Sequence, residues 1–310
     1  MQASTAAAFA QGTNRNLRVQ WESFLLFCFY FNLVYLPAST QTVQLYAQFL
    51  SRSFKSVDSI RNYISGVKTF HLILGFNTEH INNYIVNLSL KGLARLKPHA
   101  VKRAEPITLA ILTNIYDCLD FSCKDNTVYW CLFLFAFYLV ARKSNLVPTS
   151  KVDILAGRFL HISDVDIFED YLLVHFYWTK TIQFRERELI CPLVKINNEK
   201  LCPVSAFKNL LNLKLHNNLG AIFTTDDGSI VTYYRFQKKL RECVAVIGLD
   251  PKKFSTHSFR RGFATLAFQC DIPPEHIQFL GDWKSDAYKC YLELSWTDKV
   301  KILNRMFNDS

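Results

Sequence analysis

Hydrophobic residues recur three and four positions apart through most of the first hundred residues, which is the spacing of one helix face. Pro37 ends the first such stretch, because its ring cannot continue a helix. The pattern predicts helices over residues 16–36, 40–51, 56–74 and 82–96. Residues 1–13 are small and polar, lack the apolar core of a secretory signal and predict a disordered leader. Residues 14–97 therefore read as a small all-helical domain.

The pattern changes after residues 98–106, which contain two prolines and which we interpret as an interdomain linker. Three stretches alternate or carry β-branched and aromatic residues, which predicts strands over 154–162, 171–178 and 186–192. Helices are predicted over 109–117, 201–215, 232–247, 257–270 and 275–280, with one more after Ser285. The expected fold is mixed and mainly α, with a helical first domain and an α+β second domain, residues 107–310, that contains a small antiparallel sheet.

The most apolar stretch, residues 128–141, is shorter than the roughly 20 residues that a membrane span requires. It predicts a buried core helix, and Arg142 follows directly at its end. An arginine held by so apolar a helix suits a preorganised anion contact. A cap that interacts with the helix dipole is the alternative for Arg142.

A second group of polar residues lies between residues 257 and 291. His257 and Arg260 share one face at a predicted helix N-terminus, where backbone N–H groups favour a phosphate. Two prolines then break this helix, and Trp283, Tyr288 and Tyr291 follow Gly281. Each of these side chains, taken alone, is more often packed or solvated than catalytic. Their order around a helical corner is what indicates a site.

The composition narrows the class of partner. The 310 residues carry a formal net charge of +10, which favours nucleic acid over a membrane surface as the partner, although charge alone is weak support.

The nine cysteines include no CxxC pair, so they predict neither a zinc site nor a disulfide framework. We expect them to be reduced, as in an intracellular protein. The sequence has no glycine-rich phosphate loop and no metal-ligand pattern.

The order His-x-x-Arg, Leu-Gly-x-Trp and a Tyr eight positions after that Trp resembles the C-terminal signature of the tyrosine recombinases. The sequence GDWKSDAYKCYLEL is most similar to the corresponding segment in the integrases of DIRS- and crypton-type mobile elements. The resemblance implies a site-specific recombinase that cuts and rejoins DNA through a 3′-phosphotyrosyl intermediate. It implies no metal, no ATP and no other cofactor.

The resemblance also assigns the candidate catalytic residues. Arg142 and Arg260 would hold the scissile phosphate, and Lys180, on the hairpin, would give a proton to the leaving 5′ oxygen. His257 would accept a proton from the tyrosine or contact the phosphate. Tyr291, which the aliphatic Leu292 follows, is the expected nucleophile rather than Tyr288. The full catalytic set is Arg142, Lys180, His257, Arg260, Trp283 and Tyr291.

Two positions depart from the family pattern. Asn145 stands where the family often has an acidic residue, which puts a supporting carboxylate in doubt. Trp283 stands where most members have His, and an indole N–H can donate a hydrogen bond but cannot shuttle a proton.

The first domain resembles the core-binding domain that clamps DNA in this family, and basic residues suit phosphate contacts. The expected DNA-binding residues are Arg52, Lys55, Arg61, Lys68, Lys97, Lys102, Arg103, Lys238, Lys239 and Lys252. The implied partners are double-stranded DNA and further copies of the chain, as a tetramer on paired sites, with no membrane. The mobile-element resemblance implies a nuclear location.

Three other functions compete with this one. An integrase-derived protein could bind DNA without cutting it, but Arg142, Arg260 and Tyr291 are all retained. A type IB topoisomerase shares the Arg, Lys, His and Tyr chemistry, but the compact size of this chain and its integrase-like C-terminal motif argue against that class. A helical scaffold for protein partners leaves the ordered Arg, His, Arg, Tyr series unexplained.

Overall fold

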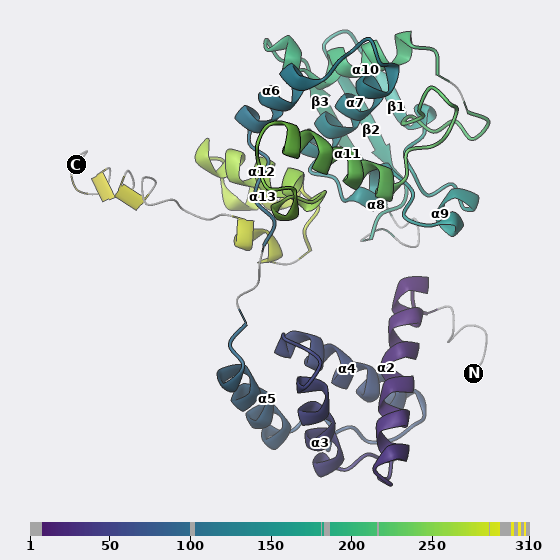
Figure 1. Ribbon diagram of the computed structural model, residues 1–310, viewed down its shortest axis with the longest axis vertical. Coiled ribbons are helices and arrows are strands. Elements are labelled where there is room, and N and C mark those ends of the chain that lie inside the picture. Colours follow the sequence, from purple (N-terminus) through teal and green to yellow (C-terminus); the bar gives the residue numbers. More distant parts are fainter. Residues whose placement is uncertain are drawn as a thin grey trace. The chain divides into compact units, whose positions relative to one another are not determined.

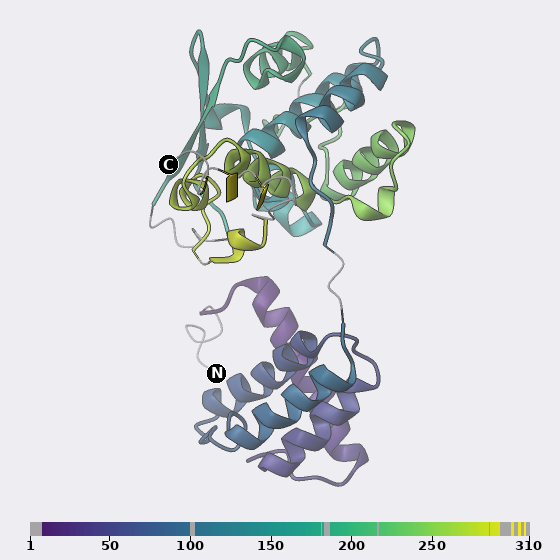
Figure 2. The ribbon, with the colours of Figure 1, turned by 90° about the vertical axis from the view of Figure 1, so that its left-hand side faces the viewer.

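The computed structural model describes residues 8–99, 103–180, 182, 187–215, 217–284, 286–291, 299–300, 303–304 and 307. The chain divides into two compact units, Met1–Lys102 and Arg103–Ser310. Each unit has its own helices (Figures 1 and 2). Each also has its own hydrophobic core.

The first unit is a helical bundle, as its hydrophobic spacing predicts. Its described helices are α2 (Gln11–Tyr30), α3 (Thr40–Ser51), α4 (Val57–Ile73) and α5 (Tyr84–Leu96). The side chains of Ser39, Ser56 and Asn83 accept hydrogen bonds from the first turns of α3, α4 and α5, which fixes where these helices begin. Phe24, Tyr46 and other apolar residues of the inner faces form the core.

The bounds of the first helix correct the sequence prediction. Helix α2 begins at Gln11, inside the segment that we predicted as a disordered leader. Its first residues are exposed, so main-chain hydrogen bonds such as Asn14 N–H to Ala10 O hold a turn that no hydrophobic pattern marks. The helix ends at Tyr30 rather than Leu36, because Asn32 adopts a left-handed backbone with φ of 51°.

The second unit is built around α7 (Lys124–Tyr138), whose residues from Val128 to Phe137 are all buried. Helix α7 packs against α10 (Pro203–Asn212) and α12 (His257–Gln269). In the described part of the chain, no helix has both the length and the hydropathy of a membrane span. The prediction of a buried core helix is confirmed. The other described α-helices of this unit are α6 (Leu109–Cys118), α8 (Lys143–Leu146), α9 (Lys151–Leu155), α11 (Tyr233–Val246) and α13 (Pro274–Leu280).

The sheet has three antiparallel strands in the order β1 (Val165–Ile167), β2 (Tyr171–Phe176) and β3 (Leu189–Val194). In β2, Leu172, Val174 and Phe176 are buried in the core, and Val174 pairs with Cys191 of β3. The predicted mixed, mainly α fold with a small antiparallel sheet is confirmed.

The strand predicted over 154–162 is wrong. This segment holds the end of α9 and the start of a 3-10 turn, η1 (Ile162–Asp164). The Ser150 side chain caps α9, and Gly157, with φ of 62°, turns the chain away after it. The helix cap and the glycine turn therefore decide the backbone conformation here, although the β-branched residues favour a strand.

Part of the predicted linker belongs to the second unit. The guanidinium of Arg261 donates to the Ala104 carbonyl at 2.7 Å, and the Glu105 N–H donates to the Lys253 carbonyl at 2.7 Å. Gly262 lies so close to Ile107 that an added Cβ would stand 1.8 Å from the Ile107 oxygen. The main chain from residue 104 onward is thus fixed against α12.

Candidate active site

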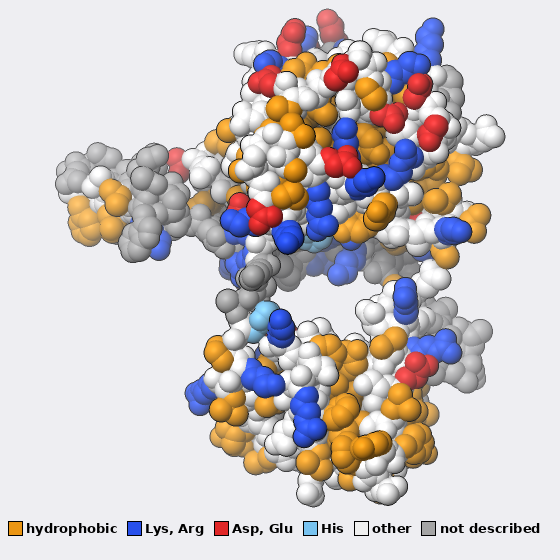
Figure 3. All heavy atoms as spheres, viewed as in Figure 1, with side chains coloured by type: hydrophobic (Ala, Val, Ile, Leu, Met, Phe, Trp, Pro, Cys, Tyr) orange, Lys and Arg blue, Asp and Glu red, His pale blue; other side chains and the backbone are white. Residues whose placement is uncertain are grey.

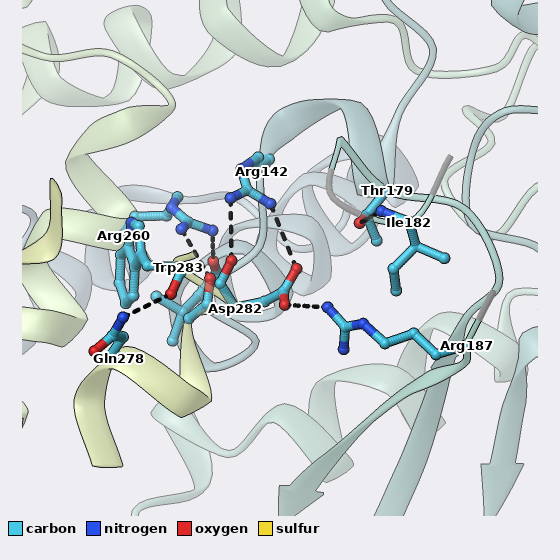
Figure 4. A network of polar contacts seen from close by, with 10 residues as sticks. Arg142, Thr179, Ile182, Arg187, Arg260, Gln278, Asp282 and Trp283 are labelled. Atoms are coloured by element: carbon cyan, nitrogen blue, oxygen red, sulfur yellow. Dashed lines mark hydrogen bonds and ion pairs between the residues drawn. The ribbon is translucent and has the colours of Figure 1, made fainter. Parts of the chain in front are cut away.

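Arg142 lies where the apolar helix α7 gives way to α8. The chain leaves α7 through Val140, whose φ is 48°, and Arg142 is the N-terminal cap of α8. Its side chain is largely buried and donates from Nη2 to the Asp282 carbonyl at 3.2 Å. The Arg142 Nη1 also lies 3.8 Å from the Asp282 carboxylate (Figure 4). The predicted anion-binding arginine is therefore fixed in place by the C-terminal part of the unit.

Arg260, in the first turn of α12, is 4% exposed. Its guanidinium donates to the carbonyls of Val140 and Gly281, the second at 3.0 Å. It also lies over the Trp283 ring, 4.4 Å from the ring centroid, as a cation–π contact. Figure 4 shows Arg142 and Arg260 directed toward the same turn, which contains Asp282 and Trp283.

The turn itself is tightly built. An added Cβ at Gly281 would lie 1.7 Å from an atom of the Trp283 ring, so only glycine fits there. The side-chain amide of Gln278 donates to the Trp283 carbonyl at 3.0 Å. Trp283 is 9% exposed, so its ring packs into the site as well as lining it.

Lys180 follows β2, on the hairpin that the sequence predicts. Thr179, just before it, is buried and exchanges main-chain hydrogen bonds of 3.0 and 3.3 Å with Ile182, while Lys180 is exposed. Residues 181 and 183–186 lie outside the described residues. Where the description resumes, Arg187 forms an ion pair with Asp282, and Glu188 accepts a hydrogen bond from His175 at 2.5 Å. The base of the hairpin is thus held on both sides.

The charges of these residues converge on His257, at the N-terminus of α12. The pKa of His257 is lowered, first by loss of hydration in this crowded site and then by positive charges on four neighbours. In order of effect, these are Arg260, Lys143, Arg142 and Lys180. His257 is neutral near pH 7 and can accept a proton.

The two candidate tyrosines lie on η4 (Asp286–Tyr291), a 3-10 turn in place of the expected α-helix. Tyr288 is 3% exposed and packs on Trp283, with ring centroids 6.1 Å apart, among Val140, Ala264 and Ile277. A side chain so deeply packed is a structural one. The side chain of Tyr291 and the residue Ser285 lie outside the described residues, so the prediction that Tyr291 is the nucleophile stays a prediction.

No family model matches the chain. The integrase/recombinase XerD homolog of Selenomonas ruminantium is 26% identical over 313 residues, which cover 96% of this chain and 86% of that protein. In fold, the chain is similar to a lambda integrase tetramer bound to a Holliday junction, with a TM-score of 0.58, 15% identity and coverage of 91% and 74%. The Tn1549 transposon integrase in complex with circular intermediate DNA gives a TM-score of 0.57, 14% identity and coverage of 86% and 85%.

In sequence, the chain is similar to the tyrosine recombinases through this XerD homolog. The two solved structures support the shared fold, and the XerD homolog supports the family through sequence. Arg142, Arg260 and Lys180 all lie close enough to His257 to lower its pKa.

Sequence reasoning missed three charged residues of this site, which are Asp282, Arg187 and Lys143. Asp282 binds Arg142 and Arg187, and the Lys143 ammonium lies 3.4 Å from the centroid of the Tyr233 ring while it adds to the charge around His257. The sequence offered one signal, an acidic residue between Gly281 and Trp283. Asn145 is buried, and its side-chain oxygen makes no hydrogen bond to any described residue, so it does not replace a carboxylate.

The basic residues predicted to bind DNA in the first unit lie on different surfaces. Arg61 and Lys68 line one groove of about 250 Å³ with the polar Asn82 and Asn87 of the α5 side. Arg61 also pairs with Asp58 at 2.8 Å.

Arg52 instead borders an apolar groove with residues such as Phe27 and Phe49, and Figure 3 shows hydrophobic side chains (orange) gathered over α2 and α3. Lys55 is exposed, and the Lys97 ammonium donates to the Ser51 carbonyl. Lys102 lies outside the described residues.

In the second unit, Arg103 and Lys252 are exposed. Lys238 lies 3.8 Å from Glu242, and the Lys239 ammonium lies 5.7 Å from the centroid of the Tyr129 ring. On the face seen in Figure 3, blue Lys and Arg side chains gather along the lower edge of this unit. Among the described residues, no group of three His, Cys, Asp or Glu side chains could hold a metal ion.

Proposed function

We propose that this chain is a site-specific DNA strand transferase that works through a 3′-phosphotyrosyl intermediate. One observation carries the proposal: the positive charges of Arg142, Arg260 and Lys180 come from three different elements and act together on His257. Cations that gather around one point repel one another, and an anionic ligand would stabilise them. A DNA phosphate is the anion that fits the family.

The reaction would proceed by attack of the Tyr291 oxygen on the phosphorus. His257, neutral near pH 7, would accept the tyrosine proton. As the new O–P bond forms, the bond from phosphorus to the 5′ oxygen breaks, and Lys180 would supply the proton that this oxygen needs. Arg142 and Arg260 would hold the non-bridging oxygens, on which negative charge develops. The phosphotyrosyl bond stores the energy of the broken bond, so a free 5′ hydroxyl can reverse the step without ATP.

The partner that we propose is double-stranded DNA. The structures with similar folds include a lambda integrase tetramer bound to a Holliday junction and a Tn1549 integrase bound to circular intermediate DNA. We propose that the groove of Arg61 and Lys68 contacts DNA phosphates and that four copies of the chain assemble on paired sites. A nuclear location stays a prediction from the mobile-element resemblance.

The test is to trap a covalent adduct on a nicked suicide substrate that carries candidate terminal sequences of the element. We expect the unchanged protein and Tyr288→Phe to form the adduct, since Tyr288 is a packed side chain. Tyr291→Phe should form none, and EDTA should not prevent the reaction. If all three proteins shift the DNA but none becomes attached to it, the chain is a DNA-binding protein that does not cut.

A further inference from the structure

We propose that Asp282 is a positioning residue that fixes the hairpin carrying Lys180 against the phosphate site of Arg142. The inference rests on the proposed function, because it assigns the means by which the proton donor reaches its place. Asp282 acts through other side chains and is not itself assigned to the reacting atoms.

Asp282 connects three elements that are far apart in the sequence. One carboxylate oxygen, Oδ2, lies 3.8 Å from Arg142 Nη1, at the junction of α7 and α8. The other, Oδ1, accepts a hydrogen bond from Arg187, on the returning side of the hairpin. Asp282 itself belongs to the turn after α13 that leads to η4. Figure 4 shows the carboxylate between the two guanidinium groups.

The turn holds this carboxylate in one orientation. Asp282 has φ of 48°, a left-handed conformation that few residues other than Gly, Asn and Asp adopt readily. On one side, the contact between Gly281 and the Trp283 ring leaves no room to shift. On the other, Gln278 holds the Trp283 carbonyl. A conformation fixed on both sides by its neighbours presents the carboxylate ready for the two arginines.

The hairpin needs such an anchor because Lys180 lies in its loop. Arg187 and Glu188 are consecutive, and each holds the base of the loop to a different element. Glu188 binds His175 of β2, which ties the loop to its own sheet. Of these two residues, Arg187 is the one that connects the loop to Asp282 in the turn after α13. We infer that the contact between Arg187 and Asp282 contributes to the position of Lys180 relative to Arg142.

The contact is partly shielded from solvent. The Asp282 side chain is 13% exposed and that of Arg187 is 42% exposed, so water and salt screen the pair less than two fully exposed charges. Without its negative charge, Arg142 and Arg187 would face each other as two cations, and the hairpin would move away to separate them. Loss of this carboxylate should thus displace Lys180 while Arg260, held by carbonyls, stays in place.

The test compares strand cleavage of two DNA substrates by the full-length protein. One has the normal 5′ oxygen at the scissile bond, and the other has sulfur there. Sulfur departs as a thiolate without a proton, because thiols are far more acidic than alcohols. A defect that arises from a misplaced proton donor is therefore relieved on the sulfur substrate.

We expect Asp282→Asn, which keeps the shape of the side chain, to lower single-turnover cleavage of the oxygen substrate about 10–100-fold, the usual cost of removing a supporting contact. DNA affinity should stay nearly unchanged, and cleavage of the sulfur substrate should approach that of the unchanged protein. Arg187→Gln, which removes the same contact from the other side, and Lys180→Ala should show the same pattern. Asp170→Asn is the matched control, because it breaks an exposed ion pair with Lys195 in the same sheet and should change nothing.

An equal defect of Asp282→Asn and Arg187→Gln on both substrates, or no defect on either, would overturn the proposal. If Asp282→Asn does not fold, Arg187→Gln decides the question alone. Failure of the proposed function is a different result, since the unchanged protein would then cleave neither substrate.

Discussion

Single side chains show how the site keeps its positive charge. The guanidinium groups of Arg142 and Arg260 are held mainly by main-chain carbonyls, of Asp282 for the first and of Val140 and Gly281 for the second. A carbonyl orients an arginine without cancelling its charge, whereas a carboxylate does both. The Asp282 carboxylate also lies 3.8 Å from Arg142. The carbonyl contacts leave the guanidinium charges available to a phosphate.

The lowered pKa of His257 leads to a prediction about the rate of DNA cleavage. In the proposed reaction the neutral ring would accept the tyrosine proton, and its pKa lies below the usual 6.5 because of lost hydration and four neighbouring cations. Cleavage should therefore be constant near pH 7 and fall at acid pH, where the ring gains a proton. Single-turnover rates between about pH 5 and 8 measure this dependence. In His257→Gln the rate should be lower and the acid decline absent; an unchanged decline would assign it to another group.

A second histidine predicts how stability depends on pH. His71 is fully buried, its Nε2 accepts the Ala38 N–H at 2.9 Å, and its Nδ1 donates to the Val67 carbonyl at 2.9 Å. Burial lowers its pKa, so the unfolded chain takes up the proton first as the pH falls. The first unit should lose stability below about pH 6.5, by at most about 1.4 kcal/mol per pH unit. Urea unfolding at several pH values should show this slope, and His71→Asn should reduce it.

At the scale of helices and strands, local patterns predicted most elements and few of their junctions. Helix α3 has the predicted bounds, since its apolar face and its Ser39 cap are both visible in the sequence. The strand predicted over 154–162 failed because Ser150 and Gly157 decide the backbone there. The hairpin was predicted, but its anchor was not. Asp282 and Arg187 are distant in sequence, and the spacing of hydrophobic residues does not predict an ion pair between two such positions.

The approach of α12 to the main chain near Ile107 gives a prediction about stability. In Gly262→Ala the new Cβ would meet the Ile107 carbonyl oxygen, which is backbone and cannot rotate away. We expect a loss of about 1–3 kcal/mol in the free energy of unfolding, the cost of overpacking. Gly92→Ala in α5 is the control, because no atom lies within 4 Å of its added Cβ, and it should be neutral or stabilising by up to about 1 kcal/mol. Equal effects of the two changes in urea unfolding would contradict this assignment.

At the scale of the whole molecule, the two units have separate cores. Phe24 belongs to the core of the first unit and Phe135 to that of the second, and both are fully buried. Either change to alanine should cost about 3–5 kcal/mol in its own unit. Scanning calorimetry should show two transitions, with Phe24→Ala lowering one and Phe135→Ala the other. A single transition that both changes lower equally would show that the units unfold together.

Helical periodicity fills the first hundred residues, and the strands of the described residues lie in the second half of the chain. The sequence therefore predicted a helical first part and an α+β second part. The placing of the site within the second unit could be predicted only in part. His257 and Arg260 are close in sequence, so their common face was foreseeable. The arrival of Arg142 beside them depends on how α7 and α12 pack, which no local pattern contains.

The burial of Arg260 affects which residues would be substituted in descendants of this protein that no longer cut DNA. A descendant that only needed to bind DNA would still have to fold, and loss of Arg260 would leave the carbonyls of Val140 and Gly281 unpaired beside an emptied space at Trp283. Lys180 is exposed, so drift there would cost little stability. Among descendants that have lost strand transfer, Lys180 should therefore vary while Arg260 persists. A retained Arg260 therefore indicates that the fold is kept, and does not by itself indicate that the reaction is kept.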